Sequence, residues 1–107
     1  MSIDGQPVLL EPNAAQGVAV ILHELATNAA KYGALSMANG QISLVWSHEA
    51  DGQLKLRWTE AGGPPVQEPT HKGFGRRIIE QMIAQQKGNT HFEWRREGLV
   101  CEITFPV

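Results

Sequence analysis

The sequence lacks several features that would assign it to a particular class of protein. It contains one cysteine, Cys101, so no disulfide can form within the chain, which suits a reducing compartment. No run approaches the roughly 20 apolar residues of a membrane-spanning helix. The start, Met1–Gly5, has neither the basic nor the apolar region of a signal peptide. We therefore expect a cytoplasmic domain without membrane contact, whether or not the full-length protein is membrane-anchored.

A long basic run is also missing. The 9 Lys and Arg residues stand against 11 Asp and Glu residues, which gives a net charge of −2, so no nucleic-acid partner is expected. One local basic group, Lys72, Arg76 and Arg77, surrounds a pair of glycines and fits either an anion site or an exposed helix face. The 107 residues, 42% of them hydrophobic, fit a single domain over 1–107.

Apolar periodicity predicts two helices. Between Ala14 and Tyr32 the apolar residues recur at the spacing of one buried helix face. Asn13 followed by Gln16 resembles a capping box at the start of this helix, and Gly33 is a natural stop. Helical spacing returns from Phe74 and ends near residues 87–88.

Strands are predicted before and after these helices. Ile3 and the segment Pro7–Leu10 predict a short hairpin, and alternating apolar residues predict two longer hairpins over 42–58 and 92–105. Residues 61–73 are rich in Gly and Pro and are expected to form a loop. This order predicts an α+β fold, a two-layer α/β sandwich whose mixed, mostly antiparallel sheet is covered on one face by helices.

Three polar residues form a stripe on the first predicted helix. At about 100° per residue, Glu24, Asn28 and Lys31 fall within an arc of roughly 60°. The stripe fits either an ordinary solvated face or a site. Asn is a mediocre helix former, whereas its amide oxygen is a suitable neutral ligand for Mg²⁺, so Asn28 favours the site.

Residues 23–36, HELATNAAKYGALS, resemble the N-box of the HWE histidine kinases. These kinases are a branch of the GHKL ATPase superfamily, which includes gyrase, Hsp90 and MutL. His23 would be the histidine of the family name, and Trp58-Thr59-Glu60 would be its Trp-x-Glu. The resemblance spans residues 7–106 and implies the Bergerat fold of the catalytic and ATP-binding domain.

The resemblance implies roles for the residues of the N-box. Asn28 would coordinate the Mg²⁺ that bridges the ATP phosphates, Lys31 would contact those phosphates, and Tyr32 would belong to the nucleotide site. Glu24 matches a catalytic position proposed to polarise the attacking group, and in a kinase it would orient that group. His23 is either its catalytic neighbour or an ordinary hydrogen-bonded helix histidine.

The segment Trp58–Val66 resembles the first glycine box of the family. Glu60 would accept a hydrogen bond from the adenine amino group, and Gly62 and Gly63 would let the backbone approach the base. Most relatives in the superfamily carry Asp at this position, and Glu defines the HWE branch. Trp58 is expected to lie in the core, because it continues the alternation of the strand.

The segment His71–Ile79 resembles the second glycine box. Gly73, Phe74 and Gly75 would place a helix N-terminus against phosphate. Arg76 is preferred over Arg77 and Lys72 as a source of added charge. The six residues between Val66 and Gly73 are fewer than in the ATP lid of typical sensor kinases, which fits the HWE branch.

The expected function is transfer of the ATP γ-phosphate to a histidine on a separate helical dimerisation domain, and from there to a response-regulator aspartate. The phosphoacceptor and sensor domains are expected outside these 107 residues, and this fragment is expected to be monomeric. The alternative is a degenerate or anti-sigma-type GHKL module that acts as a nucleotide-dependent regulatory binding partner. The intact Asn28, Lys31 and Glu60 argue against that alternative.

Overall fold

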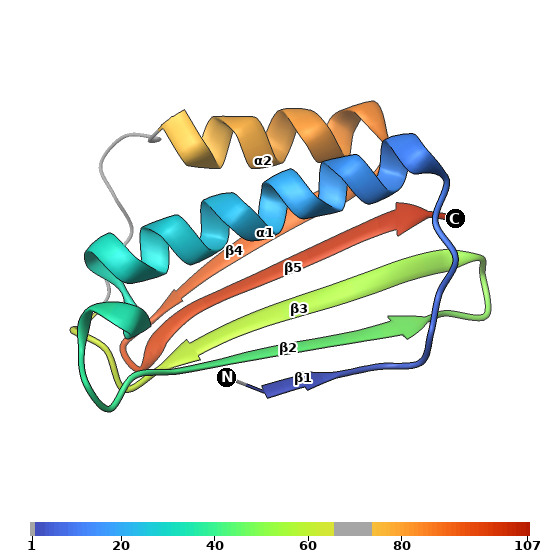
Figure 1. Ribbon diagram of the computed structural model, residues 1–107. Coiled ribbons are helices and arrows are strands. Elements are labelled where there is room, and N and C mark those ends of the chain that lie inside the picture. The colour runs from blue at the N-terminus through green and yellow to red at the C-terminus, as the bar shows by residue number, and fades with distance from the viewer. Residues whose placement is uncertain (1, 66–73) are drawn as a thin grey trace.

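The computed structural model describes residues 2–65 and 74–107, which form a five-stranded sheet with two helices packed on one face (Figure 1). The predicted two-layer α+β architecture is confirmed. In chain order the elements are β1 (Ser2–Asp4), α1 (Pro12–Tyr32), the 3-10 helix η1 (Ala34–Ser36), β2 (Gln41–His48), β3 (Gln53–Ala61), α2 (Phe74–Gln85), β4 (Asn89–Arg95) and β5 (Gly98–Pro106).

The sheet has the strand order β1-β2-β3-β5-β4. Neighbouring strands are antiparallel except for β1, which pairs parallel with β2. Both longer hairpins are therefore confirmed, and so is the mixed, mostly antiparallel sheet. Strand β3 lies at the centre between β2 and β5, and its C-terminal end lies at the same end of the sheet as the C-terminus of α1 (Figure 1).

The predicted hairpin at the start of the chain is wrong. Residues 2–4 pair with Ser43–Val45 of β2 instead, and Pro7–Leu10 is not part of a strand. Val8 and Leu10 pack against the core from this irregular segment, which explains the strand-like alternation of apolar residues. Pro7 has no N–H to donate to a ladder.

The predicted capping box at the start of α1 is also wrong, although the helix itself is confirmed. The helix begins at Pro12, two residues earlier than predicted, and Glu11 is the N-cap residue without a side-chain capping bond. Proline suits the first turn because its fixed φ is helical and its missing N–H would have had no helical partner. The helix ends at Tyr32, as predicted, and Gly33 follows.

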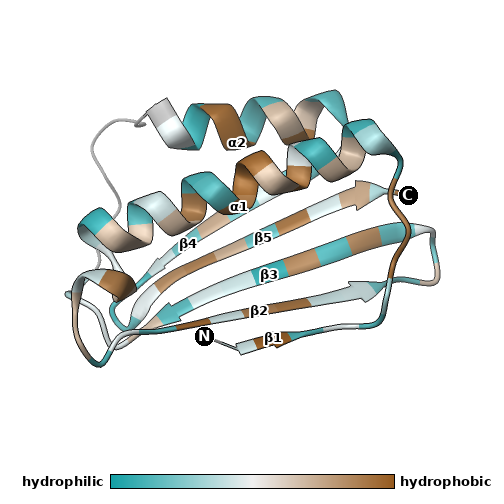
Figure 2. Ribbon diagram, viewed as in Figure 1, coloured by the Kyte–Doolittle hydropathy of each residue, from teal (hydrophilic) through white to brown (hydrophobic). Residues whose placement is uncertain are grey.

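The core lies between the two helices and the inner face of the sheet, where the apolar residues of both layers meet (Figure 2). Trp58 is 1% exposed, which confirms its predicted place in the core. Cys101 is fully buried, and this burial raises the pKa of its thiol to about 12, so the thiol stays protonated at neutral pH. The largest fully buried side chains are Trp58, Phe105, Ile21, Leu25, Ile79, Ile83 and Cys101.

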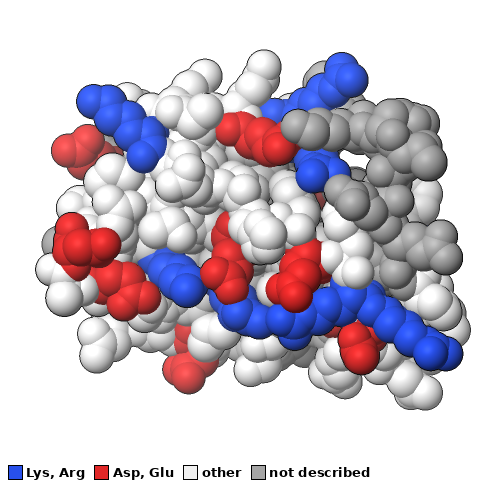
Figure 3. Space-filling model, turned by 180° about the vertical axis from the view of Figure 1, so that it is seen from behind, with Lys and Arg blue, Asp and Glu red and all other residues white. Residues whose placement is uncertain are grey.

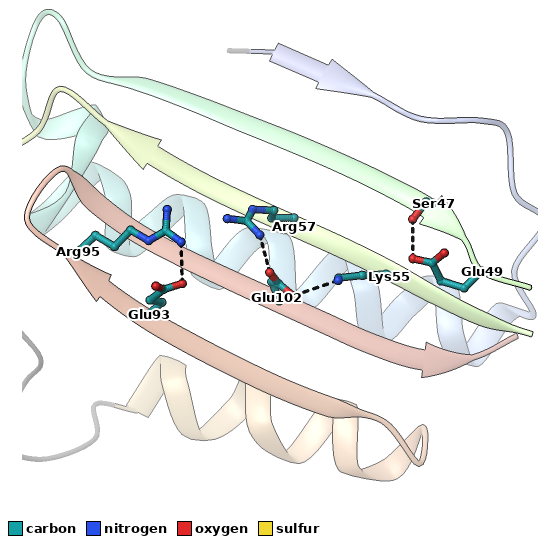
Figure 4. Close-up of polar contacts among 7 residues, drawn as sticks. All are labelled: Ser47, Glu49, Lys55, Arg57, Glu93, Arg95 and Glu102. Carbon is teal, nitrogen blue, oxygen red and sulfur yellow. Dashed lines mark hydrogen bonds and ion pairs between the residues drawn. The ribbon is translucent and has the colours of Figure 1, made fainter. Parts of the chain in front are cut away.

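Neither of the described helices packs on the other face of the sheet, and charged side chains of both signs gather there (Figure 3). Glu102 lies between Arg57 and Lys55, and Arg95 donates a hydrogen bond to Glu93 at 3.0 Å (Figure 4). This hydrogen bond lowers the pKa of Glu93. Among the described residues, no helix is long and apolar enough to cross a membrane.

Burial decides which leucines stabilise this fold. Leu25 of α1 is 1% exposed and Leu9 is 99% exposed. The same Leu→Ala substitution can therefore be compared at a fully buried and a fully exposed position. We expect Leu25→Ala to lower the free energy of unfolding by about 2–5 kcal/mol, and Leu9→Ala to change it by no more than about 0.5 kcal/mol. Urea unfolding followed by circular dichroism measures both. Equal effects of the two substitutions would contradict this core.

Candidate functional site

The polar stripe of α1 meets the first turn of α2. A Cβ built on Gly75 would lie 2.8 Å from Oε2 of Glu24 and 3.3 Å from Nδ2 of Asn28. The backbone of α2 therefore approaches both side chains closely, and a glycine is needed to leave them in place. The carboxylate, the carboxamide and the N-terminal turn of a helix thus meet at one point.

The two helices lie side by side, and the flank of α1 that carries Glu24 and Asn28 faces α2 (Figure 1). Glu24 and Asn28 are half-buried, whereas Lys31 one turn further on is exposed. His23 and Tyr32 are also exposed, and 75% of the surface of Tyr32 is open to solvent. The sequence placed all five residues on one helix. The structure brings Glu24 and Asn28 together against Gly75 and leaves the other three at the surface.

Glu60 is the one charged residue with a buried side chain among those described, with 4% of its surface exposed. In β3, Leu54, Leu56 and Trp58 face the core, and the period of two places Glu60 on the same face. Its Oε1 accepts a hydrogen bond from the backbone N–H of Ala34 at 3.0 Å, and its Oε2 accepts one from Nε1 of Trp58 at 2.9 Å.

The contact between Glu60 and Ala34 joins the end of β3 to the turn that follows α1. A Cβ built on Gly33 would overlap Oε1 of Glu60, so only glycine lets the carboxylate reach the backbone of η1. Sequence reasoning assigned Gly33 to the helix stop and gave Ala34 no role. The contact between Trp58 and Glu60 could have been predicted from their spacing, because residues two apart on a strand point to the same face.

Two glycines follow β3, and the second of them, Gly63, packs against the same turn. Gly62 has a φ of 77°, a left-handed backbone conformation that residues other than glycine rarely adopt. A Cβ on Gly63 would lie 2.8 Å from Cα of Ala34. Glu60, Gly63 and the backbone of Gly33 and Ala34 therefore form one close cluster.

Arg76, in the first turn of α2, packs against two aromatic rings of β4. Its guanidinium carbon is 4.7 Å from the ring centre of Phe92 and 5.9 Å from that of Trp94. The two rings of β4 are stacked at 6.0 Å, so a cation–π contact holds the first turn of α2 on the sheet.

Part of the predicted second glycine box lies outside the described residues. This applies to Gly73, to Lys72, to the shortened segment Gln67–Lys72 and to the side chain of Phe74. Arg77, the alternative to Arg76, is exposed on α2.

The close approach at Gly33 yields a test with a matched control in the same helical region. At Gly33 a Cβ overlaps Glu60, whereas at Gly17 of α1 it meets nothing within 4 Å. We expect Gly33→Ala to destabilise the fold by about 1–3 kcal/mol, as overpacking does. Gly17→Ala should be neutral or stabilise it by up to about 1 kcal/mol. Thermal unfolding compares the two, and a Gly33→Ala protein as stable as Gly17→Ala would contradict the contact.

Curated relatives match this chain over its whole length. It is 41% identical over 110 residues to Blue-light-activated histidine kinase 1 of Erythrobacter litoralis, covering 100% of this chain and 30% of that protein. It is 34% identical over 109 residues to the Blue-light-activated histidine kinase of Brucella ovis, covering 98% and 22%. The chain thus spans less than a third of the length of these relatives. No protein-family model matches it.

Solved structures share the fold. The histidine kinase domain of the Erythrobacter litoralis EL346 blue-light activated histidine kinase has a TM-score of 0.84 at 20% identity, covering 98% of this chain and 50% of that chain. The mycobacterial sensor histidine kinase MprB has a TM-score of 0.73 at 18% identity, covering 98% and 79%. Sequence and fold together make this chain a homologue of the catalytic domain of HWE-type histidine kinases.

Proposed function

We propose that this domain binds ATP with Mg²⁺ and transfers the γ-phosphate to a histidine of a separate helical dimerisation domain. A response-regulator aspartate would then take the phosphoryl group, as in a two-component system. The whole kinase would work in this way, with this chain as its cytoplasmic catalytic part. The relatives named as histidine kinases support the proposal.

The buried carboxylate of Glu60 is the observation that carries the proposal. A carboxylate has about four acceptor sites, and the two hydrogen bonds of Glu60 come from neutral N–H groups. A buried charge is unfavourable unless its hydrogen bonding is satisfied, so Glu60 is suited to accept one more donor. The exocyclic amine of adenine is such a donor.

The groups at the other end of the site suit phosphates and Mg²⁺. Proteins bind Mg²⁺ with one or two oxygen ligands and leave the other positions to phosphates and water. The side-chain oxygen of Asn28 provides one such ligand, and the carboxylate of Glu24 lies against the same point of α2. Lys31 is exposed one turn further on, where its charge can meet a phosphate. The amide groups of the first turn of α2 add positive potential.

These residues would act by positioning and by charge neutralisation. Bound ATP and Mg²⁺ would supply the reactive γ-phosphoryl group. Asn28 and the start of α2 would hold the phosphates in line with the incoming imidazole, and Lys31 would offset the charge of the leaving diphosphate. Glu24 would orient the imidazole. Tyr32, exposed at the end of α1, would cover the nucleotide.

Calorimetric titration of ATP tests the proposal, with a control on the same helix. Asn13 is exposed in the first turn of α1, so Asn13→Ala makes the same chemical change as Asn28→Ala at the other end of the helix. With Mg²⁺ present, we expect Asn28→Ala to weaken ATP binding about ten- to a hundredfold, the effect of losing roughly 1.5–3 kcal/mol. Asn13→Ala should bind as the wild type does, and without Mg²⁺ the two variants should converge.

Absence of binding to the folded wild-type chain at millimolar ATP would contradict the proposal. It would favour the alternative of a docking module that has lost the phosphotransfer reaction. Binding that is independent of both Mg²⁺ and Asn28 would keep the nucleotide site but remove the metal role given to Asn28.

A further inference from the structure

We propose that Trp58 is a positioning residue that sets nucleotide selectivity through Glu60. The inference rests on the proposed function, because it assumes that Glu60 receives the base. Its evidence is separate from the family resemblance. It comes from the two hydrogen bonds that hold the Glu60 carboxylate and from the burial of all three groups involved.

Trp58 and Glu60 lie two residues apart on β3 and share its inner face. The indole N–H of Trp58 donates to Oε2 of Glu60 at 2.9 Å, and the two residues are 1% and 4% exposed. An indole has a single donor and no acceptor. Because its ring is packed in the core, the N–H points in one fixed direction, and the carboxylate oxygen that meets it is fixed as well.

The second carboxylate oxygen of Glu60, Oε1, is bound by a different part of the chain. Oε1 accepts the N–H of Ala34, which belongs to the backbone of η1. Two N–H donors therefore bind two different oxygens of one group. A carboxamide in this place would turn its NH₂ group toward one of the two donors, so the arrangement requires two oxygen acceptors.

This arrangement has a consequence for the base that binds. A carboxylate held at both oxygens cannot rotate, so its remaining acceptor sites point in set directions. Adenine offers an amine to such an acceptor, whereas guanine offers a carbonyl oxygen at the corresponding position. The pinned carboxylate would repel that oxygen. Without the indole N–H, Oε2 is free to turn away and the discrimination between ATP and GTP falls.

Another tryptophan of the chain provides the matched control. Trp46 of β2 also donates its indole N–H, to the backbone oxygen of Gln6 at 2.7 Å. It is only partly buried, and it pairs with Leu56, four residues before Glu60 on β3, or about 13 Å along the strand. Trp46→Phe therefore removes an equivalent hydrogen bond at a place that the nucleotide does not touch.

The first experiment compares ATP and GTP affinities by calorimetry. We expect Trp58→Phe to reduce the preference for ATP over GTP about tenfold, the effect of one hydrogen bond to a charged group. Trp46→Phe should keep the wild-type preference. If Trp58 is merely structural, the affinities for both nucleotides fall together and their ratio stays unchanged, which would overturn the proposal.

The second experiment is a double-mutant cycle on thermal stability, which needs no nucleotide. Glu60→Gln places an amide donor against either Trp58 or Ala34. In a Trp58→Phe background the amide can turn its N–H groups into the vacated position, so Glu60→Gln should lower the unfolding midpoint less than it does in the wild type. If the changes in unfolding midpoint from the two substitutions simply add, Trp58 does not hold the Glu60 side chain and the proposal is overturned.

The two experiments also separate this inference from the proposed function. A wild-type chain that binds no ATP overturns both the function and the selectivity role. A chain that binds ATP but keeps its selectivity in Trp58→Phe overturns the inference alone. If Trp58→Phe does not fold, 3-benzothienylalanine at position 58 replaces the indole N–H by sulfur at the same ring size, and the same change in selectivity is expected.

Discussion

The arrangement of this site depends on the hydrogen bonds of the buried Glu60 carboxylate. The carboxylate joins the end of β3 to the turn after α1 through the N–H of Ala34, and to the core through the indole of Trp58. A charge with 4% exposure is unfavourable unless donors surround it. The fold supplies two such donors and a glycine, Gly33, that allows the approach.

The rest of the site follows from where this contact holds α1. With its C-terminal end tied to β3, α1 presents Glu24 and Asn28 toward α2, where Gly75 lies against both side chains. In the same turn of α2, the guanidinium of Arg76 lies over the ring of Phe92 and so holds that turn on the sheet. The proposed base and phosphate ends of the site are therefore positioned by separate contacts of one helix pair with one sheet.

The sequence was informative where structure is local. The period of α1 and the alternation of the two hairpins predicted their positions, because each pattern spans one element. The parallel pairing of β1 with β2 joins segments that are far apart in the chain, and no short pattern encodes it. Likewise, the motif predicts Glu60 as a site residue. Its hydrogen bond to Ala34 could not be predicted in this way, because it joins residues 26 positions apart that only the tertiary fold brings together.

Nuclear magnetic resonance of two protons tests the central role of Glu60 most directly. The indole proton of Trp58 and the amide proton of Ala34 both donate to its carboxylate. We expect both to exchange slowly with solvent in the free protein, and to shift together when ATP with Mg²⁺ is added but not when GTP is added. Rapid exchange of both protons in the folded protein, or signals that ignore ATP while it binds, would contradict this account.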